Sequence, residues 1–249
     1  MTQKAHAKIN TFLKITGHRD GYHTLISRFV RVPHLYDTIH FVAQECEEFT
    51  IEGCGDLPVK SNTIYQCFKA MNIETDFFKH HKVVVQKRIP TGAGLGGGSS
   101  DAGAFMRLFN EVCQLNIEPH RLAQIGATVG ADIPFFVYNY EAANVRGFGE
   151  IVEPFEDRAF EIELLTPSIH CDTPLVYKTF KHELFHTIEP EYFKGWDQLS
   201  TPEILLQTDP IHANDLYRAS LIAYPQLKEI APKGWYFSGS GSTFFRILL

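Results

Sequence analysis

The chain has 249 residues, of which 44% are apolar and 21% are charged, and its formal net charge is −6. This length allows one large domain or two small ones, with enough apolar residues for a sizeable core. The acidic balance and the lack of a long Lys/Arg cluster argue against nucleic acid as the main partner.

The first 50 residues predict a twisted antiparallel sheet. Residues 6–13 place Ala7, Ile9 and Leu13 on one face and polar side chains on the other, which is the period of a strand. Asp20-Gly21 is a turn signal. Further strands are expected over residues 22–32, 37–43 and 48–51.

Helices and strands alternate through the middle of the chain. Residues 62–72 carry apolar side chains at helical spacing, with Ser61 or Asn62 as the cap. A β-rich segment, a helix, a second helix that ends at Gly130 and two extended segments follow over residues 82–89, 102–109, 119–129, 135–138 and 143–146.

A second lobe is expected to begin near residue 151, so we predict two domains, residues 1–150 and 151–249. Its first strand lies within residues 151–165, and its last segment reads as strand, glycine turn and strand over residues 235–249. Helices are expected between them, over residues 174–188, 202–206 and 215–224. The mixture predicts an α+β fold.

The most informative segment is P-T-G-A-G-L-G-G-G-S-S-D-A at residues 90–102, where five glycines fall within seven residues. Dense glycines let backbone N–H groups turn toward one point, and the N-terminus of the following helix adds positive potential there. That combination suits a polyphosphate. The hydroxyls of Ser99 and Ser100 stand where they could reach a phosphate oxygen or its Mg²⁺. A flexible linker would have neither the strand before it nor the helix after it.

Two familiar phosphate motifs overlap this segment, and neither describes it. Gly92, Gly94 and Gly97 match the dinucleotide pattern G-x-G-x-x-G, but the tract continues into a glycine and two serines that this pattern does not require. The Walker pattern G-x-x-x-x-G-K-[ST] also nearly fits, but Gly98 replaces its lysine. We therefore expect a third kind of phosphate loop, whose neutralising cation comes from elsewhere in the chain.

Lys8 and Asp132 are the candidates for chemistry beside such a loop. Asp132 follows a glycine that ends a helix and precedes a very apolar segment predicted as a strand, so its carboxylate is either a turn residue or a partly desolvated proton acceptor. Lys8 lies on the polar face of the first strand beside Asn10 and is by itself an ordinary surface lysine. Together they would supply a base and the cation that keeps it ionised.

The segment H-E-L-F-H at residues 182–186 matches the zinc pattern H-E-x-x-H. Twelve histidines in the chain make a chance match unsurprising, and the pattern leaves the glycine loop unexplained. We interpret it as a solvated helix face and expect no resident metal site.

Several segments resemble the GHMP kinases, the family of galactokinase and of homoserine, mevalonate and phosphomevalonate kinases. Residues 90–100 are similar to the phosphate loop of that family. Five further segments resemble the branch that acts on a cytidine-diphosphate-linked methylerythritol, and they follow in order over nearly the whole chain: A-K-I-N-T-F-L-K-I-T-G at 7–17, D-G-Y-H-T-L at 20–25, G-A-D-I-P-F-F at 130–136, A-N-D-L at 213–216 and S-G-S-G-S at 238–242.

The resemblance implies phosphorylation of the 2-hydroxyl of that small-molecule substrate in the non-mevalonate route to isoprenoid precursors. ATP would be the phosphoryl donor, and Mg²⁺ is expected with it. The implied fold has two lobes, a ribosomal-protein-S5-like N-terminal lobe with the ATP loop and the catalytic pair, and a ferredoxin-like C-terminal lobe.

The resemblance also assigns residues. Lys8 and Asp132 match the catalytic pair, and Asn62 stands where an asparagine near the adenine is expected. Tyr22 and His23 match positions that hold the cytosine, with Asn10 nearby and with Tyr177 as an aromatic on the other side of the base. The ATP loop would consist of Pro90, Thr91, Gly92, Ala93, Gly94, Leu95, Gly96, Gly97, Gly98, Ser99 and Ser100.

Two alternatives stay open. Another small-alcohol GHMP kinase, of the homoserine or mevalonate type, would need the same loop but not Tyr22, His23 and Tyr177. A nucleotide-binding module without catalysis would need neither Lys8 nor Asp132. Between Tyr177 and Asn214 the chain resembles little, and Ala213 replaces a more usual polar residue.

Location is the last expectation. The five cysteines are odd in number, scattered and never spaced as C-x-x-C, which is typical of free thiols in a reducing compartment. The first residues form no apolar signal region, and no run of about 18 apolar residues exists. We expect a soluble cytoplasmic protein with no membrane partner, and the sequence leaves its oligomeric state open.

Overall fold

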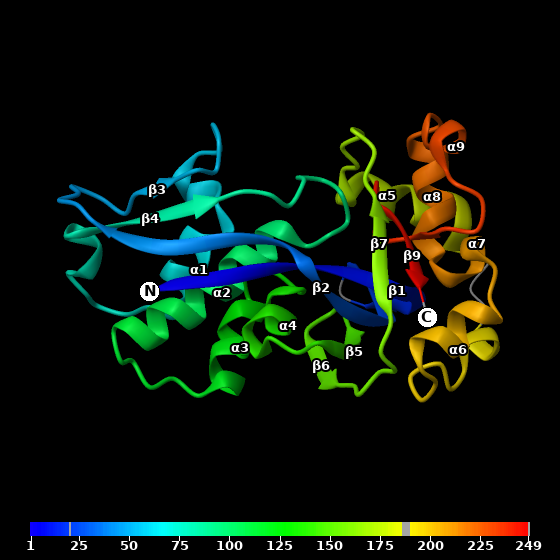
Figure 1. Cartoon of the computed structure of the whole chain (residues 1–249), viewed down its shortest axis with the longest axis horizontal. Coiled ribbons are helices and arrows are strands. Elements are labelled where there is room, and N and C mark those ends of the chain that lie inside the picture. The colour runs from blue at the N-terminus through cyan, green and yellow to red at the C-terminus, as the bar shows by residue number, and fades with distance from the viewer. Residues whose placement is uncertain (20, 186–189, 249) are drawn as a thin grey trace. The chain divides into compact units, whose positions relative to one another are not determined.

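The computed structural model describes residues 1–19, 21–185 and 190–248 (Figure 1). The chain forms two compact units. The first comprises Met1–Ala7, Val32–Ile89 and Gly96–Tyr140, and the second comprises Lys8–Arg31, Pro90–Leu95 and Glu141–Leu249. Two long strands that pair with each other, β1 (Thr2–Arg19) and β2 (Tyr22–Ala43), therefore contribute to both units. The predicted division at residue 150 stays a prediction.

The sheet of the first unit contains the C-terminal half of β2. This half pairs antiparallel with β4 (His81–Gln86), so that Thr38 lies opposite Gln86 and Ala43 lies opposite His81. The short strand β3 (Ile51–Glu52) pairs parallel with β4. Apolar side chains from β2 and β4, among them Ile39 and Val83, reach the core from this sheet.

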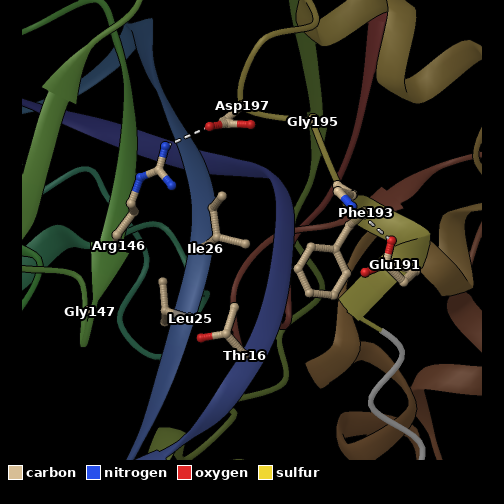
Figure 2. A pocket seen from close by; sticks show the side chains of 10 residues that line it. Thr16, Leu25, Ile26, Arg146, Gly147, Glu191, Phe193, Gly195 and Asp197 are labelled. Atoms are coloured by element: carbon tan, nitrogen blue, oxygen red, sulfur yellow. Dashed lines mark hydrogen bonds and ion pairs between the residues drawn. The ribbon is translucent and has the colours of Figure 1, made fainter.

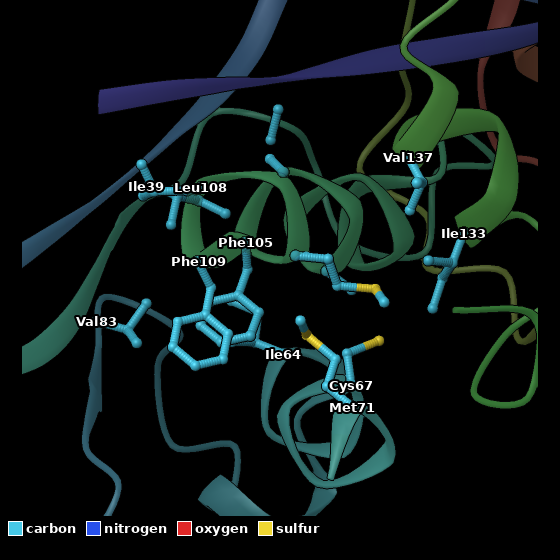
Figure 3. Close-up of a cluster of buried hydrophobic side chains, with 14 of the residues drawn as sticks. Ile39, Ile64, Cys67, Met71, Val83, Phe105, Leu108, Phe109, Ile133 and Val137 are labelled. Atoms are coloured by element: carbon cyan, nitrogen blue, oxygen red, sulfur yellow. The ribbon is translucent and has the colours of Figure 1, made fainter. Parts of the chain in front are cut away.

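Helices pack on this sheet because their apolar stripes meet it. Figure 3 shows Phe105 and Phe109 projecting from the central helix of the unit toward Ile64 and Cys67 of its neighbour. Both rings are fully buried, and truncating a buried Phe to Ala costs about 3–5 kcal/mol. The helices are α1 (Thr63–Met71), α2 (Gly97–Val112), α3 (Pro119–Ala127) and α4 (Ile133–Tyr138), with the 3-10 turns Val59–Ser61 and Phe77–Lys79.

Close approach of α4 to α2 depends on a glycine. A Cβ at Gly103 would lie 2.6 Å from the Cβ of Phe136, so the two helices meet at a distance that only glycine allows. The prediction that residues 135–138 are extended is wrong, because these residues belong to α4. This helix has a proline in its first turn and is followed by Asn139 in a left-handed conformation.

The second unit contains the other part of the six-stranded sheet, order β3-β4-β2-β5-β6 with β1 beside β2, and a separate three-stranded sheet. In one, β2 pairs antiparallel with β5 (Ala142–Gly147), with Leu25 opposite Gly147, and β5 pairs with β6 (Ile151–Pro154). The other has the order β7-β9-β8. Its strands and the helices of the unit are β7 (Glu161–Leu165), β8 (Tyr236–Phe237), β9 (Phe244–Leu248), α5 (Thr173–Thr179), a π-helical turn (Phe180–Leu184), a 3-10 turn (Pro190–Phe193), α6 (Thr201–Leu206), α7 (Pro210–Ala213), α8 (Asp215–Ala223) and α9 (Leu227–Ile230).

One buried arginine organises the irregular segment before α6. The guanidinium of Arg28 donates to the carbonyls of Trp196, Asp197 and Leu199 and to Oδ1 of Asn144. The Arg28 side chain is fully buried, and burial lowers its pKa to about 10 although nearby aspartates favour its charge. Because a buried guanidinium needs its partners, this residue fixes a segment that has little regular structure of its own.

The A-N-D-L segment has a structural role. Asn214 caps α8 through its Oδ1, which accepts from the N–H of Leu216, and its Nδ2 donates to the carbonyls of Phe237 and Gly239. The adjacent Asp215 accepts from Lys14 and from the N–H of Ile15. Two neighbouring side chains thus hold the S-G-S-G-S turn and β1 against α8.

Most predicted elements are confirmed, and several differ in addition to residues 135–138. The strand predicted at 48–51 is reduced to Ile51–Glu52, residues 151–165 form two strands with a break, and the helix predicted at 174–188 changes to a π-helical turn at Phe180, with residues 186–189 outside the described part. Within the described residues, no helix is long and apolar enough to cross a bilayer. The five cysteines, all described, are free thiols, of which Cys67 and Cys171 are buried.

Candidate active site

The glycine loop between β4 and α2 has an alternating backbone. Gly92, Gly94 and Gly96 have φ values of +67°, +73° and +71°, in the left-handed region that glycine enters without steric cost. Alternation of this kind turns successive N–H groups toward one side and forms an anion-binding concavity. The loop therefore has the backbone that the sequence predicted for a phosphate site.

The carbonyls of this loop are held by the protein. The carbonyl of Gly94 accepts from Oγ of Ser238 at 3.1 Å. Backbone N–H groups of Cys171, Thr243 and Lys8 donate to the carbonyls of Gly92, Ala93 and Leu95, at 3.0, 3.1 and 3.0 Å. Within the described part of the chain, the N–H groups of residues 91–96 donate to no backbone carbonyl. The arrangement leaves the N–H side of the loop for a ligand.

Close packing against backbone requires glycine at position 94, whereas at position 92 the near neighbour is a side chain. A Cβ at Gly94 would lie 2.2 Å from the carbonyl oxygen of Ser238, and a Cβ at Gly92 would lie 2.1 Å from Nδ1 of His170. The exposed His170 thus lies directly against the loop. Sequence reasoning missed it, because a single histidine 78 positions beyond Gly92 gives no local signal.

Helix α2 begins immediately after the loop without a side-chain cap. Gly96 is its N-cap residue and offers no side chain, so the first N–H groups of α2 stay available to an anion. Of the two predicted hydroxyls, Ser100 is buried and its Oγ donates to the carbonyl of His6 at 2.7 Å. Ser99 is half-buried, and no hydrogen bond of its hydroxyl is seen in the described residues, so its part in binding phosphate stays a prediction.

Asn62 lies at the start of α1, beside the first turn of α2. Its Oδ1 accepts from the N–H of Ile64 and caps α1, and the neighbouring Thr63 donates from Oγ1 to the carbonyl of Gly98 at 2.9 Å. The cap role explains its burial. The same contact with Gly98 brings the start of α1 to the end of the phosphate loop.

Asp132 is the residue immediately before α4, and its carboxylate forms no capping bond to that helix. The turn that carries it lies next to the start of α2, since a Cβ at Gly130 would be 3.9 Å from Oγ of Ser99. The first unit therefore brings Asp132, Ser99 and the uncapped helix terminus into one neighbourhood.

Lys8 is not a surface lysine. It is 4% exposed, its Nζ donates to Oδ1 of Asn10 at 2.6 Å, and its ammonium lies 4.4 Å from the centre of the Phe29 ring. A buried cation above an aromatic face is held electrostatically by the ring. Lys8 belongs to the second unit and Asp132 to the first, and their pairing stays a prediction.

The three aromatic candidates fall into two contacts. His23 stacks on Tyr177, with ring centroids 5.7 Å apart and planes at 22°. The exposed Tyr22 instead meets Phe148 edge to face at 5.7 Å. The structure thus brings His23 and Tyr177 together and adds Phe148, which the sequence analysis did not single out.

The environment of His23 favours its neutral form. Burial lowers its pKa, and the neighbouring His18 and Lys181 lower it further. Its side chain is 8% exposed, and Nδ1 has no hydrogen-bond partner among the described residues. A buried ring nitrogen without a partner is costly unless a ligand completes it.

Comparison with known proteins agrees with this geometry. The profile of the GHMP kinases N terminal domain matches residues 62–140. A 4-diphosphocytidyl-2-C-methyl-D-erythritol kinase of Sulfurovum sp. (strain NBC37-1) is 55% identical over 249 residues, 98% of this chain and 97% of that one. The kinase of the same name from Sulfurimonas denitrificans is 41% identical over 255 residues, 98% of this chain and 96% of that one.

The chain belongs to the 4-diphosphocytidyl-2-C-methyl-D-erythritol kinase family. A crystal structure of a 4-(cytidine 5'-diphospho)-2C-methyl-D-erythritol kinase is 27% identical with a TM-score of 0.73, covering 98% of this chain and 89% of that one. The mevalonate kinase of Methanococcus jannaschii shares the fold at 13% identity and a TM-score of 0.62, over 100% of this chain and 90% of that one. The predicted family and its α+β fold are confirmed.

The second unit of this family member also contains a pocket apart from the predicted site residues. Figure 2 shows it between Leu25, Ile26 and Arg146 on one side and Phe193 and Asp197 on the other; its volume is about 470 Å³. Its charged groups are paired, with Arg146 on Asp197 at 2.6 Å and Lys194 on Glu191 at 3.2 Å. None of the predicted site residues lines it.

The H-E-x-x-H segment at residues 182–186 lies only partly within the described residues. His182 belongs to the π-helical turn, where it is exposed, and His186 falls outside the described residues. Among the described residues no group of three His, Cys, Asp or Glu side chains is arranged to hold a metal ion. The interpretation as a solvated helix face stays a prediction.

Proposed function

We propose that this protein transfers the terminal phosphoryl group of ATP to the 2-hydroxyl of 4-diphosphocytidyl-2-C-methyl-D-erythritol, in the non-mevalonate route to isoprenoid precursors. The observation that carries this proposal is the glycine loop, whose carbonyls are bound by the protein and whose N–H groups lead into an uncapped helix terminus. The substrate follows from the names of the relatives that are similar over nearly the whole chain.

ATP would lie with its phosphates on residues 90–100 and its base near Asn62. The left-handed glycines fit the negative charge of a triphosphate, as do the loop N–H groups, which donate to no backbone carbonyl in the described part of the chain. Mg²⁺ would accompany ATP and neutralise charge that develops on the phosphates. Ser99 is the hydroxyl that we assign to the phosphates or their ion, since Ser100 is bound to β1.

Lys8 and Asp132 would act on the accepting hydroxyl. Asp132 lies in the turn before α4, beside Ser99 at the start of α2, and its carboxylate would take the proton as the oxygen attacks. The Lys8 ammonium would keep that carboxylate ionised and stabilise negative charge on the reacting oxygens. Phosphoryl transfer depends mainly on such positioning and electrostatics, so both groups need a fixed geometry.

The cytidine would be held by aromatic and polar contacts in the second unit. Tyr22 and Tyr177 offer ring faces, and the neutral His23 offers a ring nitrogen without a partner to an edge of the base. Asn10, the fourth residue that we assign to the substrate, lies on β1 beside Lys8 and Ser27. We further propose that the reaction takes place in the cytoplasm, for which the free thiols are the support.

A substrate comparison tests the proposal. Purified protein is assayed for ATP consumption with the cytidine-diphospho substrate, with homoserine and with mevalonate, and the phosphorylated product is identified by mass spectrometry. Turnover of the cytidine-diphospho substrate at least 100-fold above the other two supports the proposal. Preference for homoserine or mevalonate assigns the protein to another GHMP activity, and turnover of none of the three overturns the kinase proposal for these alcohols.

A further inference from the structure

A chain of three buried hydrogen bonds begins at the ammonium of Lys8 and ends at a backbone carbonyl. Nζ of Lys8 donates to Oδ1 of Asn10 at 2.6 Å, and Nδ2 of Asn10 donates to Oγ of Ser27 at 2.9 Å. Oγ of Ser27 donates to the carbonyl of Phe12 at 2.5 Å. Lys8, Asn10 and Ser27 are 4%, 2% and 0% exposed, so solvent does not replace these partners.

The groups at the two ends of this series of hydrogen bonds fix which atom donates in each bond. An ammonium can only donate, and the carbonyl of Phe12 can only accept. Ser27 must therefore give its proton to Phe12, which leaves its oxygen lone pair for the amide of Asn10. The NH₂ group of Asn10 then faces Ser27 and its oxygen faces Lys8. The reversed amide would place an NH₂ group against an ammonium and leave two donors in conflict.

Strand geometry brings these groups together. Lys8 and Asn10 are two residues apart on β1, and Ser27 and Phe29 are two residues apart on β2, so each pair lies on one face of its strand. Phe29 lies under the ammonium of Lys8, and Ser27 lies under the amide of Asn10. The backbone N–H of Asn10 donates to Oγ of Ser238, which itself donates to Gly94 of the phosphate loop.

We propose that Ser27 is a positioning residue for phosphoryl transfer: its hydroxyl sets the orientation of the Asn10 amide and, through it, the place of the Lys8 ammonium. This inference rests on the proposed function, which gives Lys8 its part in the reaction. Ser27 itself contacts neither ATP nor the accepting alcohol and acts only through Asn10.

Removal of the hydroxyl has a defined consequence. In Ser27→Ala, the NH₂ group of Asn10 loses an acceptor and the carbonyl of Phe12 loses a donor, both in a buried place. The amide is then free to rotate, and the Asn10 oxygen, one of the groups that place the ammonium, shifts with it. Misplacement of a reacting group by about 1 Å can cost on the order of a hundredfold in rate. We expect kcat to fall about tenfold or more and the KM for ATP to change less than about twofold, because the phosphate loop keeps its own contacts.

A double-mutant cycle separates positioning from a general structural role. We compare Ser27→Ala, Asn10→Ala and the double variant, each checked for folding by circular dichroism and thermal midpoint. If Ser27 acts through Asn10, its replacement lowers kcat less than about twofold in the Asn10→Ala background. If the two losses multiply, or if Ser27→Ala leaves kcat unchanged, the proposal is wrong.

A matched variant controls for the loss of a buried hydroxyl. Ser220 is also fully buried, and its Oγ donates to the carbonyls of Leu216 and Ser240. Ser220→Ala is expected to lower the thermal midpoint as Ser27→Ala does but to leave kcat within about twofold of the wild type. An equal loss of kcat in both serine variants would assign the effect to destabilisation. Should Ser27→Ala not fold, Ser27→Cys fills the same space with a weaker acceptor and takes its place in the cycle.

A spectroscopic readout makes the test independent of turnover. The side-chain amide signal of Asn10, identified by its absence in Asn10→Ala, should exchange slowly with solvent in the wild type and faster in the Ser27 variant. Equal exchange in both would overturn the inference. Wild-type turnover alone tests the proposed function, and the cycle uses whichever alcohol the wild type phosphorylates, so failure of one is distinguished from failure of the other.

Discussion

Nζ of Lys87 lies 2.6 Å from Oδ2 of Asp101, a buried residue near the start of α2. The same ammonium lies 2.5 Å from Oδ2 of Asp37, so two buried carboxylates share one cation. Asp37 also accepts from the N–H groups of Arg88 and Ile89, whereas Oδ1 of Asp101 has no partner among the described residues. Burial raises the pKa of Asp101 to about 7; Lys87 opposes this rise, and the charge of Asp37 adds to it.

The raised pKa of Asp101 predicts a pH-dependent stability. In the unfolded chain its pKa is near the ordinary 3.8, so the folded state binds the proton more tightly. The stability from this group is fully present below about pH 4 and is lost as pH rises toward about 7. Asp101→Asn removes the titration, so the thermal midpoint of the variant minus that of the wild type should increase from pH 5 to pH 8 in a fluorimetric melt.

A surface aspartate provides the control for this measurement. Asp76 is exposed, and its hydrogen bond to Lys79 lowers its pKa, so it does not titrate between pH 5 and pH 8. The thermal midpoint of Asp76→Asn should therefore differ from that of the wild type by the same amount at every pH from 5 to 8. A constant difference between Asp101→Asn and the wild type would mean that Asp101 keeps its charge in the fold.

The phosphate loop is tested at Gly98, which lies inside α2. A Cβ at this position would lie 3.6 Å from Oγ1 of Thr63, an ordinary van der Waals contact. Gly98 has no positive φ, so a left-handed backbone is not the reason for its glycine. Gly98→Val should lower ATP affinity sharply by blocking close approach of phosphate to the helix terminus, with little change in the thermal midpoint of the free protein. Isothermal titration with a non-hydrolysable ATP analogue measures it; unchanged affinity would remove Gly98 from the site.

Gly96, unlike Gly98, is expected to be needed for the stability of the free protein. Its φ of +71° costs an L-residue about 1–2 kcal/mol, so Gly96→Ala should destabilise the free protein by about that amount. Gly98→Ala is the matched variant, and it should be neutral or stabilising because alanine favours a helix by up to about 1 kcal/mol over glycine. Chemical denaturation of the two variants compares them directly. An equal effect at both positions would contradict the backbone described for the loop.

The sequence predicted local structure well where one strong signal acts alone. The strand at residues 6–13, the glycine loop and the cap at Asn62 all have local causes, and the structure contains each of them, although both faces of that strand are buried. Residues 135–138 were misread because an apolar run carries no period, although Asp132 before Pro134 and Asn139 after the run were signals for a short helix.

Other parts of the structure depend on distant residues. The strands predicted over residues 22–32 and 37–43 form one strand, β2, which continues through Pro33. This residue lies between the stretch paired with β5 and the stretch paired with β4, so neither pairing needs the N–H that proline lacks. Ser238 holds both Asn10 and Gly94 from 228 and 144 positions away. No local pattern carries such contacts, so Ser27, Ser238 and His170 could be found only in the fold.

The proposed catalytic pair predicts large and non-additive losses. Asp132→Asn should fold normally, bind ATP and lose at least about a hundredfold in turnover, the scale for a positioned proton acceptor. Lys8→Met should behave similarly, and the double variant should be little worse than either single one, because the two groups would act as a unit. Steady-state kinetics of the three variants measures this. Near-normal turnover in well-folded Asp132→Asn would remove Asp132 from the mechanism.

The stacked pair His23 and Tyr177 predicts how the cytidine is recognised. Tyr177→Ala should weaken cytidine diphosphate binding by about 1–3 kcal/mol, the range for one lost base-stacking contact. His23→Ala should relax the discrimination between cytidine and uridine diphosphates, because a site whose buried polar group seeks a partner rejects the base that leaves it unpaired. Because the two ring centroids are 5.7 Å apart, the double variant should lose less binding free energy for cytidine diphosphate than the sum of the single losses.

Titrations with cytidine diphosphate, uridine diphosphate and an ATP analogue measure these effects. ATP binding should not change in either variant, because the glycine loop has its own contacts. Tyr140→Ala, which removes one ring of the Tyr138–Tyr140 stack in the first unit, is the matched control and should leave cytidine diphosphate binding unchanged. If the wild type and both site variants bind cytidine diphosphate equally, His23 and Tyr177 do not hold the base, and the cytidyl group must be recognised elsewhere.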